Sequence, residues 1–154
     1  MPEEPGRIRA VLDTNLIIRG FLRPGGVSGR LLDLLAEAAF GLVTSEILLD
    51  ELAATMRQPR LQRLGPFSEE EIERMVRVVR RVAVRVVPGN YDVDVVPTDV
   101  RDNPVVACAL EGEARFLVTD DRRDLLPLKT VRFAGLLPVE IVSAPGFLRI
   151  LRAR

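Results

Sequence analysis

Near its N-terminus the chain reads Ile8-Arg9-Ala10-Val11-Leu12-Asp13-Thr14-Asn15. This short apolar and β-branched run predicts a buried strand, and it stops abruptly at the carboxylate of Asp13. In α/β proteins such a strand delivers a charged group to the crevice at its carboxyl end. We therefore expect Asp13 to mark the place where other acidic groups of the chain meet.

The composition predicts one globular domain. The 154 residues are 47% hydrophobic and 29% charged, which is enough apolar material for a real core. We expect a single domain over residues 1–154, with a core at about 8–142 and a flexible N-terminus over 1–7. No apolar run approaches a membrane span, and the acidic, proline-rich start is unlike a signal peptide. A cytoplasmic protein is the resulting expectation.

Two absences narrow the chemistry. The chain has no histidine, which excludes Ser-His-Asp triads and imidazole zinc sites. A metal ion would therefore be held by carboxylates and other oxygens, a donor set that selects Mg²⁺ or Mn²⁺. The formal net charge is zero, so binding of nucleic acid would depend on local patches of arginine.

Strand and helix patterns alternate along the chain. The expected strands are 8–13, 42–44, 83–87 and 115–119, with further short candidates at 131–133 and 139–142. The expected helices are 15–22, one that Ser28 can cap and that continues to Ala39, and one from Glu46 to about Arg57 that starts after Ser45. Ser68 and Glu71 form a capping-box pattern that opens a long helix to about Val82. A helix starts at Asp102-Asn103-Pro104, runs through Ala109 and stops at Gly112, and Ser143 caps a last short helix. This alternation predicts a three-layer α/β/α sandwich around a mostly parallel sheet of four to five strands. The carboxyl ends of parallel strands then share one edge.

Four carboxylates attract attention, and they are Asp13, Glu51, Asp102 and Asp121. Three of them follow a strand or begin a helix on the same predicted edge, whereas Glu51 lies on the 46–57 helix between apolar positions. Carboxylates packed together repel one another unless a divalent cation compensates their charge. Such a cation also activates water and polarises a phosphoryl oxygen. The alternative is that the three aspartates only cap helices and that Glu51 is a solvated helix residue.

At these residues the sequence resembles the PIN-domain family of metal-dependent ribonucleases, and more closely the VapC-like toxins of bacterial type II toxin–antitoxin pairs. The matching pieces are Val11-Leu12-Asp13-Thr14-Asn15, Ser45-Glu46-Ile47-Leu48-Leu49-Asp50-Glu51-Leu52, Asp102-Asn103-Pro104 and Val118-Thr119-Asp120-Asp121. The resemblance implies a central parallel sheet, an acidic pocket that binds Mg²⁺ or Mn²⁺, and cleavage of single-stranded RNA.

Carried over by position, the resemblance assigns the catalytic metal ligands to Asp13, Glu51, Asp102 and Asp121. The supporting polar residues would be Thr14, Asn15, Asn103, Thr119 and Asp120. Two assignments stay open. Asp99 competes with Asp102 for the third acid, and Asp120 competes with Asp121 for the fourth.

Cations are needed around an acidic pocket that binds RNA, because the phosphates would otherwise be repelled. The candidates are Arg19 and Arg23 near the first helix, Arg122 and Arg123 beside the fourth acid, and a further group of Arg57, Arg60 and Arg63. The alternative is a merely solvated arginine-rich surface. The resemblance further implies a homodimer and, for a toxin, a small antitoxin partner.

Two other functions compete with a ribonuclease. One is a phosphatase with Asp13 as covalent nucleophile, but Asn15 stands where such sites usually have a second acid. The other is a non-catalytic module for RNA binding or assembly that has kept the acids.

Overall fold

The computed structural model describes residues 6–89, 103–133 and 135–154. Its strands are β1 (Arg9–Leu12), β2 (Gly41–Ser45), β3 (Arg85–Val87), β4 (Phe116–Val118), β5 (Thr130–Val131) and β6 (Val139–Val142). Its helices are α1 (Thr14–Leu22), α2 (Val27–Ala36), α3 (Glu46–Met56), α4 (Pro59–Gln62), α5 (Glu69–Val82), α7 (Pro104–Glu111) and α8 (Ala144–Arg152), with a 3₁₀ turn η1 at Leu126–Leu128.

The strands form one sheet in the order β3-β2-β1-β4-β6-β5. All neighbours are parallel except β5, which pairs antiparallel with β6. The α/β architecture and the mostly parallel sheet are as predicted, but the sheet has six strands rather than four to five. The edge strand β5 is two residues long and overlaps the short candidate at 131–133, and β6 matches the candidate at 139–142. Because β5 runs antiparallel, its carboxyl end lies at the opposite edge from the others.

β1 lies in the interior of the sheet, between β2 and β4. Ala10 is in register with Leu42 on one side and with Phe116 on the other. The chain moves outward from β1 to β2 and β3, and then returns to the other side of β1 with β4. The end of β1 is therefore the point where the strand order reverses, which is where α/β sheets bind ligands.

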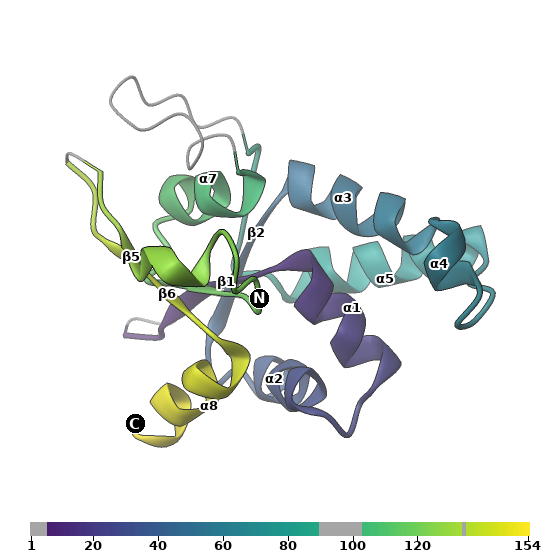
Figure 1. The fold of residues 1–154 in the computed structure, drawn as a ribbon, viewed down its shortest axis with the longest axis horizontal. Helices are drawn as coiled ribbons and strands as arrows, with labels where there is room; N and C mark the ends of the chain where they lie inside the picture. The colour runs from purple at the N-terminus through teal and green to yellow at the C-terminus, as the bar shows by residue number, and fades with distance from the viewer. Residues whose placement is uncertain (1–5, 90–102, 134) are drawn as a thin grey trace.

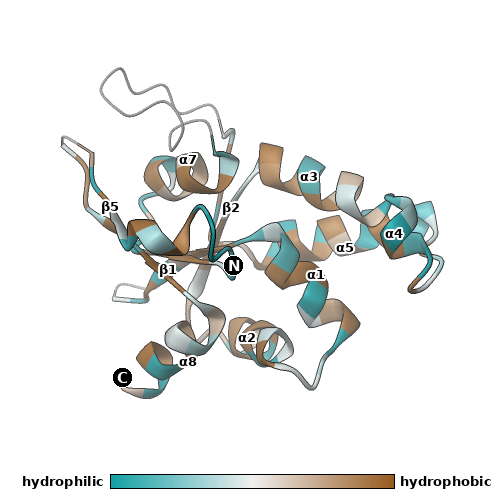
Figure 2. Cartoon of the chain, in the orientation of Figure 1, coloured by the Kyte–Doolittle hydropathy of each residue, from teal (hydrophilic) through white to brown (hydrophobic). Residues whose placement is uncertain are grey.

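Side chains on the two faces of the sheet belong to two separate clusters. Ala10 and Leu12 pack with α1, α2, α3, α5 and α8, whereas Val11 packs with α7 and the segment around η1. Figure 1 shows α7 on one side of the strands and α2 and α8 on the other. Apolar colouring dominates the strands and α7 in Figure 2. Strands β1, β2 and β4 are buried on both faces, which explains why they read as continuous apolar runs.

Most of the predicted helix starts are confirmed. The hydroxyls of Ser45 and Ser143 accept hydrogen bonds from Leu48 N and Gly146 N, at 3.0 and 3.1 Å. Asn103 caps α7 through Val105 N, also at 3.0 Å. These caps are local, so the sequence specifies them directly.

The expectation that Ser28 caps its helix is wrong. Helix α2 begins at Val27 with Gly26 as its N-cap, and no side chain provides a capping hydrogen bond. Ser28 is in the first turn instead. A Cβ on Gly29 would lie 2.1 Å from the carbonyl oxygen of Pro24, so the turn before α2 folds closely over a residue without a side chain.

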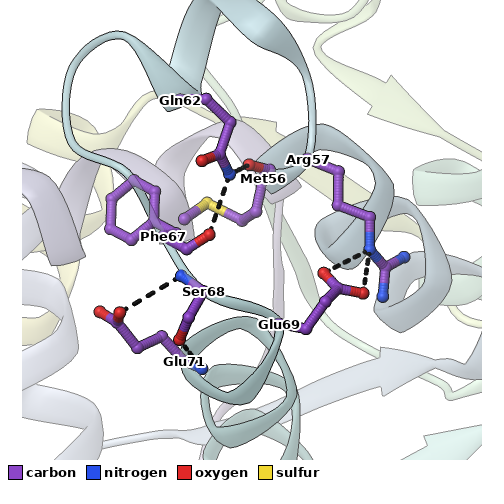
Figure 3. Close-up of polar contacts among 7 residues, drawn as sticks. All are labelled: Met56, Arg57, Gln62, Phe67, Ser68, Glu69 and Glu71. Carbon is purple, nitrogen blue, oxygen red and sulfur yellow. Dashed lines mark hydrogen bonds and ion pairs between the residues drawn. The ribbon is translucent and has the colours of Figure 1, made fainter.

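Helices α3 and α5 lie side by side and are joined through α4 (Figure 1). Figure 3 shows the junction, where Ser68 and Glu71 form the predicted capping box at 3.1 and 3.2 Å. The amide of Gln62 donates to the carbonyls of Met56 and Phe67. Ion pairs connect the two helices at both ends of α3, Glu46 with Arg80 and Arg57 with Glu69. Helix α3 is thus held in place along its length.

None of the helices in the described ranges is both long and apolar enough to cross a bilayer.

Candidate functional site

Asp13 stands at the carboxyl end of β1, as predicted. Its backbone N–H donates to the carbonyl of Val118 at 2.9 Å, which ties the end of β1 to the end of β4. Asp13 occupies the N-cap position of α1, yet its side chain makes no capping hydrogen bond. The interpretation of Asp13 as only a helix cap therefore does not apply, and its carboxylate is available for another role.

Thr119 orients that carboxylate. The Thr119 side chain is fully buried, and its hydroxyl donates to Asp13 Oδ2 at 2.8 Å. The same hydroxyl accepts a hydrogen bond from the backbone N–H of Asp121 at 3.0 Å. One threonine thus connects the ends of β1 and β4 and positions the acids that follow both strands.

The pKa of Asp13 is raised above its ordinary value of 3.8, chiefly because burial penalises the charged form. Hydrogen bonds from the Thr119 hydroxyl and the Thr14 backbone act in the opposite direction. The negative charges of Asp121 and then Asp120 raise the pKa further. Asp13 is therefore a carboxylate whose negative charge is inadequately compensated by its surroundings.

Glu51 reaches the same place from α3. Its pKa is also raised, first by desolvation and then by the charge of Asp13, while a hydrogen bond from the Thr14 hydroxyl lowers it. Glu51 as a whole residue is exposed to solvent. The rise in its pKa therefore reflects the local surroundings of its carboxyl group. The buried Thr14 follows Asp13 in the chain. Its backbone lowers the pKa of Asp13 and its side chain lowers the pKa of Glu51, so Thr14 favours the charged form of both acids.

Asp120 and Asp121 have different partners. Asp120 Oδ2 forms an ion pair with the guanidinium of Arg19 at 2.5 Å. Asp121 Oδ1 accepts from the backbone N–H groups of Arg123 and Asp124 at 3.0 and 2.9 Å, so it caps the following turn. Asp121 has the larger electrostatic effect on Asp13. This difference favours Asp121 as the acid of the pair that acts together with Asp13.

The other predicted residues are placed as follows. Asn15 is exposed at the start of α1 and lines a hollow together with Arg19 and Arg23. The side-chain oxygen of Asn103 is engaged in capping α7. Asp102 and its competitor Asp99 lie outside the described residues. Within residues 6–89, 103–133 and 135–154, no group of three or more acidic, histidine or cysteine side chains is close enough to hold a metal ion.

Arg19, Arg23 and Arg122 all line a second hollow next to Asp120. Arg123 is exposed in the turn that Asp121 caps. The pairing of Arg19 with Asp120 cannot be read from the sequence, because 101 positions separate the two residues and only the sheet order brings them together. Arg60, a candidate cation in the sequence, joins Arg19 and Arg23 around the first hollow.

Comparison with known proteins identifies the family of the chain. A family model described as "PIN domain" matches residues 9–123, and the chain belongs to this family. The chain is also similar to the uncharacterized protein MJ1680 of Methanocaldococcus jannaschii, with 31% identity over 125 residues that cover 80% of this chain and 76% of the relative. No solved structure matches the chain.

PIN domains are generally nucleases and typically use divalent metal ions, and both properties fit the site. Asp13 and Glu51 are two partly desolvated carboxylates with raised pKa values, and the charge of Asp13 contributes to the shift at Glu51. A divalent cation between acidic groups removes this repulsion, and oxygen ligands are those that Mg²⁺ and Mn²⁺ prefer. The residues present therefore suit such an ion.

Proposed function

We propose that the protein is an endoribonuclease that depends on Mg²⁺ or Mn²⁺ and cleaves single-stranded RNA with water as the nucleophile. The observation that carries this proposal is the state of Asp13. It is a partly buried carboxylate at the point where the strand order reverses, and its side chain makes no capping hydrogen bond. The charges of Asp121 and Asp120 raise its pKa further, and Asp13 in turn raises the pKa of Glu51.

Asp13, Glu51, Asp102 and Asp121 would hold the ion, with the role of Asp102 resting on sequence resemblance alone. When bound, the ion would polarise a phosphoryl oxygen and lower the pKa of a water molecule. The chain's own contribution is orientation. Thr119 fixes Asp13 by its hydroxyl, and the Thr14 side chain lowers the pKa of Glu51. These two hydroxyls favour the charged form of the acids without bringing a positive charge that would compete with the ion.

We also propose the narrower role of a VapC-like toxin that forms a homodimer and is inhibited by a small antitoxin. Support for it comes from the order and spacing of the sequence motifs from Val11 to Asp121. A short neighbouring reading frame for a DNA-binding antitoxin is the expected genomic context. If expression of the protein in bacteria has no effect on growth, with or without that neighbour, the toxin role is wrong even if RNA is cleaved.

The central experiment is cleavage of a single-stranded RNA by wild type, Asp13→Asn and Glu51→Gln, each with Mg²⁺, Mn²⁺ or EDTA. We expect each substitution to reduce cleavage by more than the roughly 10- to 100-fold typical of residues that only support a metal ligand. Asp50→Asn, one position before Glu51 on the same helix, and Asp33→Asn on α2 are matched controls that should retain activity, because both side chains are exposed.

Equal cleavage by wild type and Asp13→Asn would refute the mechanism. A phosphoaspartate trapped on Asp13 would instead support the phosphatase alternative. RNA binding with no metal-dependent cleavage by any form of the protein would support the non-catalytic alternative.

A further inference from the structure

The hollow beside Asp120 is bordered by positive charge and by the start of a helix. It has a volume of about 480 Å³, and its lining includes Arg19, Arg23, Arg122 and Ser28. We name it the arginine hollow. Three guanidinium groups there face one carboxylate, that of Asp120, which is paired with Arg19. Arg23 and Arg122 have no ion pair in the part of the chain that the structure describes, so the hollow keeps uncompensated positive charge.

The first turn of α2 opens into the same hollow. Gly26, Val27 and Ser28 all contribute to the lining, and no side chain caps the backbone N–H groups of this turn. Free N–H groups at a helix start, together with the helix dipole, favour an anion. The close packing of Gly29 against Pro24 fixes the turn that presents them.

Ser28 adds a polar group to the hollow. The residue is only 4% exposed, and no hydrogen bond of its hydroxyl is found within the described ranges. In those ranges no fully buried polar side-chain atom lacks a partner, so the hydroxyl oxygen reaches solvent, and Ser28 lines the hollow. A hydroxyl placed there exchanges hydrogen bonds with water, and a phosphate oxygen that enters the hollow can take the place of that water.

The position of the hollow connects it to the acidic site. Asp120, whose charge acts on Asp13, lies in its wall, and Arg19 and Arg23 line both this hollow and the one that contains Asn15. A polyanion that runs along α1 from its C-terminal end to its N-terminal end would therefore pass from the arginines to the carboxylates.

We propose that the arginine hollow binds a non-scissile phosphate of the RNA backbone, and thereby holds the strand next to the acidic site. This inference rests on the proposed ribonuclease function. Arg23 and Arg122 supply charge-assisted hydrogen bonds, the first turn of α2 supplies backbone N–H donors, and Ser28 adds a neutral one. Such a contact compensates the repulsion between the phosphates and the carboxylates at the strand ends.

The test is the salt dependence of RNA binding in EDTA, where no cleavage is expected. Fluorescence anisotropy of a labelled single-stranded RNA is measured for wild type, for the double variant Arg23→Gln/Arg122→Gln and for the control Arg74→Gln on the exposed face of α5. Loss of one phosphate contact reduces the slope of log K against log salt concentration by about 0.7. We expect such a reduction in the double variant and the wild-type slope in the control.

Inorganic phosphate provides a second readout that needs no RNA. Backbone amide NMR signals of residues 27–29 should shift on addition of phosphate to the wild type, and not in the double variant. We expect Ser28→Ala to weaken RNA binding without changing the salt slope, because a hydroxyl carries no charge. Melting temperatures of the variants close to that of the wild type exclude unfolding as the cause.

The outcomes separate the two proposals. If the wild type cleaves RNA but the double variant keeps the slope of the control, the phosphate site is refuted and the ribonuclease stands. If the slope falls but no form of the protein cleaves RNA, the ribonuclease is refuted and the phosphate site stands. Amide shifts with inorganic phosphate but an unchanged slope for RNA would assign the hollow to free phosphate and overturn its role in RNA binding.

Discussion

Thr119 is the residue on which the geometry of the acids most directly depends. Replacement by valine removes the hydrogen bond to Asp13 and leaves the N–H of Asp121 without its acceptor. We expect Thr119→Val to lower the free energy of unfolding by about 1–3 kcal/mol, the usual effect of an unsatisfied buried polar group. Urea denaturation measures this change. Thr119→Ser keeps the hydroxyl and should recover most of the loss, and failure to do so would show that the methyl group matters more than the hydrogen bonds.

The raised pKa values of Asp13 and Glu51 predict how stability depends on pH. An acid whose pKa is higher in the folded state binds more protons folded than unfolded, so the free energy of unfolding decreases as pH rises through that interval. For these residues the interval begins near the ordinary values of 3.8 and 4.5 and extends upward to the folded values.

In EDTA we therefore expect the wild type to lose stability relative to Asp13→Asn as the pH is raised through this interval. Mg²⁺ or Mn²⁺ should reverse the loss, and binding at 100 times Kd stabilises a protein by about 2.7 kcal/mol. Thermal melts of both proteins across pH, with and without the ion, measure the effect. A difference in melting temperature between wild type and Asp13→Asn that does not vary with pH would contradict the raised pKa of Asp13.

At the scale of elements, the helix starts show what the sequence can predict. Ser45, Ser68 with Glu71, Asn103 and Ser143 act within three positions of their own helices, so the pattern alone identifies them. Ser28 has the same local pattern but does not cap its helix. The backbone of Pro24 packs closely against Gly29, and the helix starts after Gly26 instead. That packing depends on a backbone approach that no propensity describes.

The capping box of α5 should contribute more to stability than the ion pair beside it. Ser68→Ala is expected to lower the free energy of unfolding by about 0.5–2 kcal/mol, because it leaves Glu71 N without its acceptor. Glu69→Gln breaks the ion pair with Arg57. Both side chains of this pair are about half exposed, so the free energy of unfolding should decrease by a clearly smaller amount. Chemical denaturation of both variants in one buffer compares them. Equal effects would mean that the ion pair fastens α3 to α5 more strongly than its exposure suggests.

At the scale of the molecule, the sequence predicted the layers and the mostly parallel sheet because alternating apolar runs and amphipathic helices determine them. It placed Asp13 and Asp121 at strand ends for the same reason. It could not predict that Asp120 pairs with Arg19 or that Thr119 donates to Asp13. These contacts join positions 101 and 106 apart, and they follow from the register of β1 and β4.

The extent of the domain is still a prediction, and calorimetry can test it. If residues 1–154 fold as one unit, the calorimetric and van't Hoff enthalpies of unfolding should be equal. The two clusters of the core share the strands of one sheet, which favours a single transition. Two resolved transitions would show that residues 1–154 do not unfold as one unit.

The interior position of β1 also has a consequence for biosynthesis. Asp13 and Glu51 leave the ribosome early, but Thr119 and Asp121 belong to a strand that enters the sheet beside β1 more than 100 residues later. β4 is in turn covered at its outer edge by β6, near the C-terminus. A nascent chain therefore lacks Thr119 and Asp121, and with them the contacts that orient Asp13, until β4 has been synthesised. If the proposed ribonuclease function holds, a chain still under synthesis has no complete acidic site with which to attack the message that encodes it.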